Sequence, residues 1–310
     1  MTASIAVPLS AQASNCARTS TGRTPINDLG TASYLGYQGG LYPDGSNERP
    51  GVQNLEGTLF ADTVIPRTAA GVPDPLSGRV VFLSIGMSNT LHEFDSFIDL
   101  AKADPQRSPK VVVVNGAQGG ASADRIDTPD APYWAYVDGQ LSAAGANGAQ
   151  VQAVWLNEAV ADPTSVFPND ARALQDSLNA IVHILKKRFP NLWLVYLSSR
   201  IYAGYASSNL NPEPYAYDSA FSVKWLIQDQ INGSLSVGPT SVPWLSWGPY
   251  LWADGLRARS DGLTWACSDF MADGTHPDAQ GAAKVARALL DFVHTDATAR
   301  IWYEHAGLIP

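Results

Sequence analysis

The sequence is poor in charged residues and in long apolar runs, and each shortage excludes a class of protein. Only 16% of the 310 residues are charged, the formal net charge is -9, and the 20 Lys and Arg residues form no cluster. A nucleic acid or an anionic membrane surface requires a basic patch, so neither is an expected partner. No apolar run approaches the roughly 20 residues of a membrane-spanning helix, so no membrane span is expected.

Cysteine is also scarce, because the chain has only Cys16 and Cys267. Two cysteines exclude a disulfide-rich scaffold and leave two alternatives, a single bridge or two unpaired buried thiols. We predict the bridge, since Cys267 lies close before Asp273 and a bonded Cys16 would hold the irregular N-terminal segment against that loop. Such a bond persists in an oxidising compartment, and we therefore expect a secreted or periplasmic protein.

Signals for metals and phosphate cofactors are missing. No Cys and His residues have the spacing of metal ligands, so no metal is expected. The glycine-rich turn at residues 116–120 has no Lys of the kind that a phosphate-binding loop carries. The sequence therefore predicts chemistry that needs no cofactor.

From about residue 78 the sequence alternates between strand and helix patterns. Four β-rich runs with little polar alternation are typical of parallel strands that are covered on both faces: RVVFLSIG, KVVVVNGA, VQAVWLNEA and LWLVYLSSR. Helical patterns follow at 89–104, 170–189 and 217–232, and the last helix begins near 277. This alternation predicts an α/β protein with three layers, α/β/α, around a doubly wound and mostly parallel sheet.

The first 75 residues differ from the rest in composition. They are rich in Gly, Pro, Ser, Thr and Asn and show neither a helical nor a strand period. We predict that residues 1–75 are an irregular extension wrapped on the core, and that residues 76–310 form one domain.

Polar or glycine-rich turns follow three of the predicted strands. Ser88 follows the first, the glycines of 116–120 follow the second, and Asn157 with Glu158 follows the third. Because parallel strands end at the same edge of a sheet, these turns are expected to meet there and form a site. Taken alone, Ser88 is equally suited to cap the helix that follows, and the glycines to a plain turn.

A serine becomes a nucleophile when a base removes its proton, so the prediction depends on a histidine. His276 stands in the stretch DGTHPD, three residues after Asp273, in a compact turn before a helix. The chain order Ser88, Asp273, His276 matches a nucleophile, an orienting carboxylate and a base. For the remaining histidines a surface or packing role is expected: His92, His183, His294 and His305.

Together these segments resemble the SGNH (GDSL-like) hydrolase superfamily, whose members present Ser, Gly, Asn and His from four blocks in this order. SIGMSN is similar to the first block, NGAQGGAS to the second, VWLNEA to the third and DGTHPD to the fourth. The resemblance covers roughly residues 78–295 and implies a flavodoxin-like hydrolase domain. It implies that Ser88 is the nucleophile, with His276 and Asp273 completing the triad. It also implies an oxyanion hole of the Ser88 and Gly120 backbone N–H groups and the Asn157 amide.

Two departures from the family pattern point to a substrate class. Met87 and Asn89 flank Ser88, which is closer to the Gly-Gln-Ser-Asn of sialate O-acetylesterase-like carbohydrate esterases than to Gly-Asp-Ser. Trp155 stands where the third block usually has Gly. Aromatic faces stack on sugar rings, and Trp265 lies shortly before the Asp-His loop, so Asn89, Trp155 and Trp265 are candidate substrate contacts.

The sequence therefore predicts a serine esterase for short O-acyl groups, above all O-acetyl, on a carbohydrate. A small-molecule or glycan ester is the expected partner. Two alternatives stay open: an esterase for short-chain lipid or aliphatic esters, and a catalytically idle sugar-binding protein on the same fold.

Overall fold

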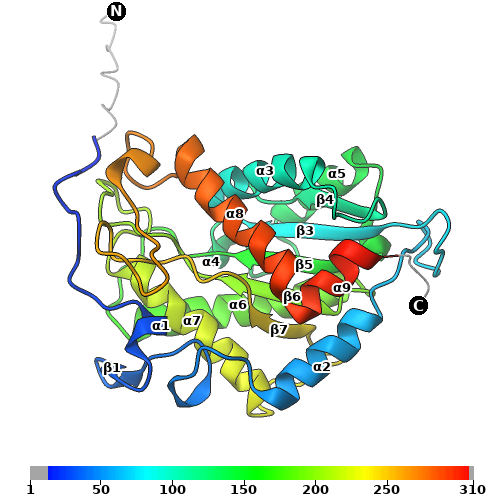
Figure 1. The fold of residues 1–310 in the computed structure, drawn as a ribbon, viewed down its shortest axis with the longest axis horizontal. Coiled ribbons are helices and arrows are strands. Elements are labelled where there is room, and N and C mark those ends of the chain that lie inside the picture. Colours follow the sequence, from blue (N-terminus) through cyan, green and yellow to red (C-terminus); the bar gives the residue numbers. More distant parts are fainter. Residues whose placement is uncertain (1–12, 307–310) are drawn as a thin grey trace, which may run out of the picture.

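The computed structural model describes residues 13–306, which form a three-layer α/β/α fold (Figure 1). Its five-stranded sheet has the order β4-β3-β5-β6-β7, and every neighbouring pair is parallel. The strands are β3 (Val80–Gly86), β4 (Val111–Asn115), β5 (Val151–Asn157), β6 (Leu194–Ser198) and β7 (Trp244–Trp247). The predicted doubly wound parallel sheet is confirmed.

Helices cover both faces of the sheet. On one face α3 (Ser88–Ala103) packs against α8 (Ala279–Thr295), and on the other α6 (Asn169–Arg188) packs against α7 (Tyr215–Ile231). These four helices agree with the predicted ranges to within two residues. The shorter helices are α1 (Ile26–Leu29), α2 (Gly51–Asp62), α4 (Ala123–Ile126), α5 (Tyr133–Ala143) and α9 (Ala297–His305). None of the helices between residues 13 and 306 has the length and apolar character needed to cross a membrane.

The strands show why the sequence lacked polar alternation. Every residue of β3, β5, β6 and β7 is buried, because helices exclude water from both faces of the sheet. The sequence predicted four strands and missed β7. The four residues of β7 lie within a Pro- and Gly-containing segment and are too few to establish a periodic pattern.

The extension contains more regular structure than predicted, since α2 is a 12-residue helix and a small hairpin joins β1 (Ser33–Tyr34) to β2 (Tyr37–Gln38). The buried residues of α2 are small or polar, namely Gln53, Gly57 and Ala61, whereas Val52, Leu55 and Leu59 are exposed. A Cβ at Gly57 would lie 2.2 Å from the ring of Trp244, so the helix approaches the sheet through its smallest residue. The helix α2 was not predicted, because its large apolar residues lie on the exposed face and not on the buried one.

The described part of the extension is bonded to the core. The hydroxyls of Tyr42 and Ser246 are 2.9 Å apart, and Arg49 forms an ion pair with Asp296 at 2.5 Å. The buried carboxylate of Asp254 accepts hydrogen bonds from residues 20–22. The blue segment in Figure 1 accordingly follows one side of the molecule from top to bottom.

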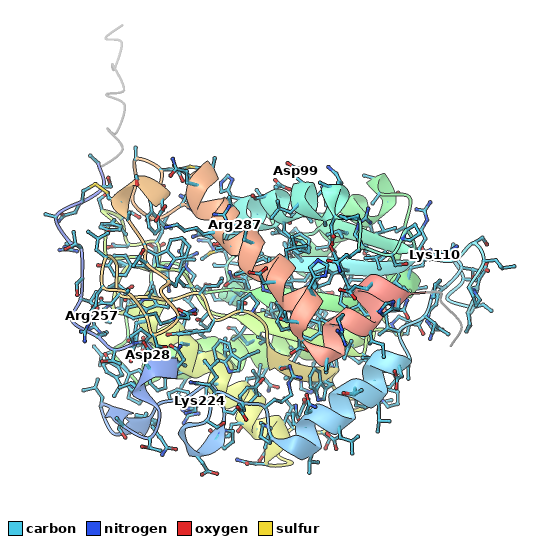
Figure 2. The ribbon with its side chains drawn as sticks, viewed as in Figure 1. Asp28, Asp99, Lys110, Lys224, Arg257 and Arg287 are labelled. Carbon is cyan, nitrogen blue, oxygen red and sulfur yellow. A yellow bond between two sulfur atoms is a disulfide. The ribbon has the colours of Figure 1, made fainter. Side chains whose placement is uncertain are left out.

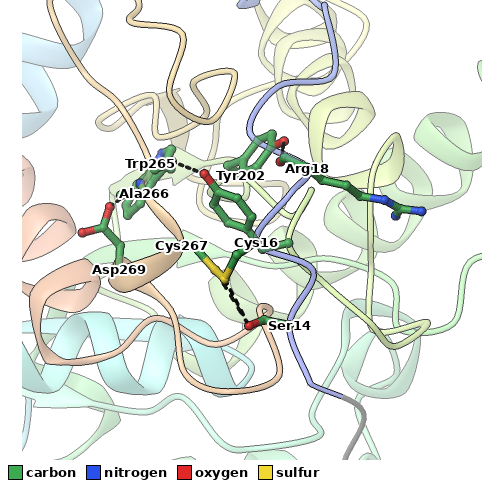
Figure 3. Close-up of a disulfide and its surroundings, with 9 residues drawn as sticks. Ser14, Cys16, Arg18, Tyr202, Trp265, Ala266, Cys267 and Asp269 are labelled. Carbon is green, nitrogen blue, oxygen red and sulfur yellow. Dashed lines mark hydrogen bonds between the residues drawn. A yellow bond between two sulfur atoms is a disulfide. The ribbon is translucent and has the colours of Figure 1, made fainter.

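Cys16 and Cys267 form a disulfide, which confirms the predicted bridge (Figure 3). Their Cα atoms are 5.4 Å apart although 251 positions separate them in the sequence. Beside the bond, the backbone N–H of Ser14 donates to the carbonyl oxygen of Ala272 at 2.6 Å. The N-terminal segment therefore lies directly against the residue that precedes Asp273.

Candidate active site

Ser88 stands at the tight turn between β3 and α3. A Cβ at Gly86 would lie 2.3 Å from the hydroxyl of Thr90 and 2.5 Å from the carbonyl oxygen of Asn157, so the strand enters this turn through a residue without a side chain. Met87 is the N-cap and Ser88 is the first helical residue, so Ser88 does not cap the helix. The turn leaves its hydroxyl at the carboxyl edge of the sheet.

Three side chains form a continuous chain of hydrogen bonds at this edge. Ser88 Oγ lies 2.7 Å from His276 Nε2, and His276 Nδ1 lies 2.5 Å from Asp273 Oδ2. The structure thus brings together the three residues that the sequence proposed as nucleophile, base and orienting carboxylate. We call Ser88, His276 and Asp273 the catalytic chain, after the roles that the sequence predicts for them.

The turn that contains Asp273 and His276 is fixed by its own backbone. Asp273 Oδ1 accepts the N–H groups of Thr275 at 2.9 Å and His276 at 3.0 Å. Gly274 has φ +67°, and a Cβ there would lie 2.1 Å from the carbonyl oxygen of Tyr205, so the turn requires glycine. Partial burial raises the pKa of Asp273, but the hydrogen bonds from His276 and Thr275 outweigh burial and lower it below its ordinary value. The carboxylate is therefore ionised at neutral pH.

A cavity of about 340 Å³ opens beside Ser88 and His276. Its wall includes Gly119 and Gly120 after β4, residues 161–162 after β5 and Arg200 after β6, so four strand ends contribute once Ser88 is counted. This volume lies at the small end of the range for ligand pockets. Two of the three predicted turns, those at Ser88 and at residues 119–120, line this cavity, whereas Asn157 and Glu158 do not.

Gly120 lies on the wall of this cavity, as an oxyanion donor must. Its φ is +79°, a conformation that favours glycine, and no atom lies within 4 Å of the position that a Cβ would occupy. Within residues 13–306 no acceptor binds its backbone N–H. This backbone N–H is therefore unused by the described part of the chain.

Asn157, the other predicted donor, does not line the cavity. Its side chain is 2% exposed, and Nδ2 donates to Glu93 Oε2 at 3.0 Å. Its carbonyl oxygen accepts the Thr90 hydroxyl at 2.6 Å. One N–H of the amide therefore points to a buried carboxyl group rather than to the oxyanion position.

Of the three candidate substrate contacts, the structure brings only Asn89 to the cavity. There its Nδ2 donates to the carbonyl oxygen of Thr275 at 3.1 Å and so braces the turn of the catalytic chain. Trp155 is fully buried and donates to Ser198 Oγ at 3.0 Å, and Trp265 is 1% exposed and donates to the carbonyl oxygen of Leu251 at 2.9 Å. Neither lines the cavity. The prediction for both tryptophans was wrong because they belong to the core.

Behind the catalytic chain lie five buried polar residues, which we call the floor cluster: Asn89, Glu93, Asn157, Glu158 and Arg200. Each is at most 2% exposed. Within the described part of the chain, one side-chain oxygen of each of the first four has no hydrogen-bond partner, and neither do Nε and Nη2 of Arg200. The floor cluster thus keeps unused donors and acceptors next to the catalytic chain.

Burial dominates the protonation of the floor cluster. It raises the pKa of Glu93 to about 7, against the opposing effects of the Arg200 charge and the Asn157 hydrogen bond. Burial raises the pKa of Glu158 well above its ordinary value and lowers that of Arg200.

Glu93 and Arg200 were not among the predicted functional residues. Glu93 nevertheless shares the buried face of α3 with Thr90 and Phe97, at helical spacing, which marks it as a buried carboxyl. Arg200 ends the run LWLVYLSSR, directly after a buried strand. A charged residue at the carboxyl end of a parallel strand is expected near a binding site, so its position could have identified Arg200.

Two of the remaining histidines, His92 and His294, contact other side chains. His92 packs edge-on against His276 with ring centres 6.0 Å apart, and His294 pairs with Asp104 and Glu304. Within residues 13–306, no three His, Cys, Asp or Glu side chains are placed to hold a metal ion.

Comparison with known proteins gave weak similarities only. No protein-family profile matches the chain, and no curated protein sequence matches it. An acetylxylan esterase from Geobacillus stearothermophilus is 13% identical, with 68% of this chain and 93% of that one covered and a TM-score of 0.40. A lipopolysaccharide acetyltransferase periplasmic domain from Salmonella ser. Paratyphi A is also 13% identical, with 79% and 97% covered and a TM-score of 0.38. At this similarity no activity or residue role is carried over from either protein.

Proposed function

We propose that the chain is a serine esterase that hydrolyses short O-acyl esters carried by a carbohydrate. The observation that carries the proposal is the catalytic chain, in which Ser88 Oγ, the His276 ring and the Asp273 carboxylate are joined at 2.7 and 2.5 Å beside an open cavity. A binding protein has no use for a serine that is hydrogen-bonded to a base and an orienting carboxylate.

In the first half-reaction, Ser88 Oγ attacks the ester carbonyl carbon while His276 Nε2 takes the hydroxyl proton. The tetrahedral intermediate collapses when His276 returns that proton to the oxygen of the leaving alcohol, and the acyl group stays on Ser88. Water then attacks the acyl-enzyme while His276 takes its proton, and His276 returns this proton to Ser88 Oγ as the Ser88–acyl bond breaks and the carboxylic acid leaves. Asp273 holds the ring tautomer and stabilises the imidazolium throughout.

The oxyanion of each intermediate is stabilised by the backbone N–H groups of Ser88 and Gly120. The free N–H of Gly120 on the cavity wall supports this role. Loss of one such donor typically lowers the rate about 10²- to 10³-fold. The structure gives Asn157 no such support, because its buried amide does not line the cavity and donates to Glu93 Oε2.

The small volume of the cavity supports a short acyl group, and two polar side chains on its wall support a carbohydrate. A volume of about 340 Å³ leaves little room for a long acyl chain. The exposed side chains of Arg125 and Asp162 lie on the wall, where sugar hydroxyl groups find hydrogen-bond partners. The tryptophans give no such support, because Trp244, Trp247, Trp252 and Trp265 are all buried.

The test is hydrolysis by the purified protein of 4-nitrophenyl esters from acetate to palmitate, together with a panel of O-acetylated glycans. We expect turnover of the acetyl and butyryl esters, much slower turnover of octanoyl and longer esters, and release of acetate from at least one glycan. Faster turnover of the palmitoyl ester would favour a lipid esterase, and absence of turnover with every ester would favour the idle binding protein.

We also propose that the protein is exported. The disulfide between Cys16 and Cys267 supports this, because such bonds persist outside the reducing cytosol. Fractionation of the producing cells tests it, with the protein expected in the periplasm or the medium. Recovery from the cytosol with both thiols free to alkylate would contradict the proposal.

A further inference from the structure

We propose that Arg200 binds a carboxylate carried by the substrate, so that the preferred esters are those of acidic molecules. The inference rests on the proposed esterase function and assigns a substrate class to the same cavity. It starts from one property of Arg200, which is a buried cation on the cavity wall with unused hydrogen-bond donors.

Arg200 differs from the other deeply buried cations in residues 13–306, since the other three are directly paired. Lys186 donates to the carbonyl oxygen of Leu192 at 2.7 Å, Lys224 binds the carbonyl oxygens of residues 38 and 39, and Arg259 pairs with Asp261 at 2.6 Å. Arg200 is only 2% exposed and forms no ion pair with a carboxylate of the described chain. Its Nε and Nη2 lack any hydrogen-bond partner there.

A buried charge without a direct partner is costly, and a neutral acceptor compensates only part of that cost. Four carboxyl groups act on Arg200 through space, but none is in ion-pair contact with it: Glu93, Glu158, Glu213 and Asp273. A carboxylate matches the planar fork of a guanidinium and supplies both the charge and the acceptors. Arg200 is one of the residues that line the cavity, so a carboxylate bound in the cavity is placed next to this side chain.

The strand order separates Arg200 from the oxyanion donors. Gly120 follows β4 on one side of β3, whereas Arg200 follows β6, two strands away on the other side. Neighbouring strands are about 4.8 Å apart, so the end of β6 lies about 10 Å from the end of β3. The backbone of Arg200 therefore enters the cavity wall on the side opposite Gly120, which suits this residue to a substrate group other than the carbonyl oxygen that Gly120 binds.

Charged groups on the cavity wall also favour an anion. The wall carries the two arginines Arg125 and Arg200 and one carboxylate, Asp162. The carboxylate of the substrate belongs either to its acyl part or to its alcohol part, and the chemistry at Arg200 is the same for both. Two matched pairs of esters distinguish these sources.

The first pair is 4-nitrophenyl butyrate and the mono-4-nitrophenyl ester of succinic acid, which differ by a carboxylate on the acyl part. The second is an O-acetylated methyl glucoside and the matching O-acetylated methyl glucuronoside, which differ on the alcohol part. We expect a preference in the pair whose carboxylate stands on the part of the substrate that contacts Arg200. In that pair kcat/KM of the acidic ester should exceed kcat/KM of the neutral ester about tenfold or more, chiefly because its KM is lower. This preference should decrease as salt is added. In Arg200→Gln this ratio should approach about one.

The matched control is Arg257→Gln, which removes the same charge from an exposed arginine that does not line the cavity (Figure 2). It should keep both the activity and the acidic preference of the wild type. A wild-type ratio near one in both pairs overturns the inference while leaving the esterase intact. An equal loss of kcat for both members in Arg200→Gln also overturns it, because it assigns Arg200 to the oxyanion.

Binding measurements keep the inference testable if Arg200→Gln does not fold, or if no ester is hydrolysed. Calorimetry on the wild type should then detect glucuronate or succinate in preference to glucose or butyramide, with an affinity that falls as salt is added. Selective, salt-dependent binding supports the carboxylate site even where the esterase proposal fails. Absence of such selectivity overturns it.

Discussion

The catalytic chain and the floor cluster lie side by side, and they differ in whether their polar atoms have hydrogen-bond partners. In the catalytic chain each of Ser88, His276 and Asp273 has a partner, and Asp273 uses both carboxylate oxygens. In the floor cluster, Glu93, Glu158 and Arg200 are more deeply buried and yet keep unpaired atoms.

The difference shows two ways of positioning a polar side chain. The geometry of His276 and Asp273 is set by hydrogen bonds within one short turn, so it depends little on distant parts of the chain. The floor cluster draws on α3, β5 and the segment after β6, and is held by the packing of these elements. Its unpaired atoms retain the capacity to bind water or a substrate group.

The largest effect is expected when the catalytic chain is broken. Ser88→Ala and His276→Ala should each lower kcat by at least about 10⁴-fold, because a nucleophile and its base act as one unit. For the same reason the double variant should be little worse than either single one. Steady-state assays with 4-nitrophenyl acetate measure this, and circular dichroism checks that the fold is retained. Wild-type turnover in Ser88→Ala would refute the nucleophile assignment.

The second prediction concerns the disulfide, and it tests whether the turn with Asp273 and His276 keeps its geometry without that bond. Removing the Cys16–Cys267 bond by a double Cys→Ser change should lower the unfolding free energy by up to about 5 to 6 kcal/mol, which the chain-entropy estimate gives for cysteines 251 positions apart. Turnover should fall only a few-fold, since Asp273 and His276 keep their own hydrogen bonds. Urea unfolding and kcat are compared with and without the bond. A loss of activity as large as that of His276→Ala would show that the turn depends on the bridge.

Much of this site was predictable because its signals are local in the sequence. Ser88 follows a continuous apolar run, and Asp273 and His276 share one short glycine-containing turn. The same holds for the sheet, since β3, β4, β5 and β6 are each preceded or followed by clear turn residues. Cys16 and Cys267 are the only cysteines of the sequence, so the alternative to a bond between them was two unpaired thiols.

The missed features depend on contacts between distant segments. The helix α2 is stable because Gly57 lets it approach Trp244, and no local apolar pattern reports that contact. Trp155 was assigned to the substrate because an aromatic ring suits a sugar, but it packs on Phe94 with ring centres 5.6 Å apart. The spacing of Glu93 on α3 marks it as buried, but its hydrogen bond with Asn157 joins α3 to β5, and neither segment alone shows that partner.

The smallest expected effect concerns the charge of the floor cluster, and it follows from the pKa of Glu93, which burial raises from 4.5 to about 7. The folded chain binds this proton more tightly than the unfolded chain, so the associated stability is complete below about pH 4.5 and is lost as the pH rises through about 7. A shift of this size corresponds to about 3 kcal/mol.

Glu93→Gln keeps an oxygen that accepts the Asn157 amide but does not ionise. Between pH 4.5 and pH 8, its unfolding free energy should therefore rise relative to the wild type by about that amount. Urea unfolding across this range measures the difference, with the exposed Glu56→Gln as control. If Glu93→Gln and the wild type follow parallel pH profiles, Glu93 is ionised in the folded protein at neutral pH, and Arg200 is neutralised by it more fully than its free donors indicate.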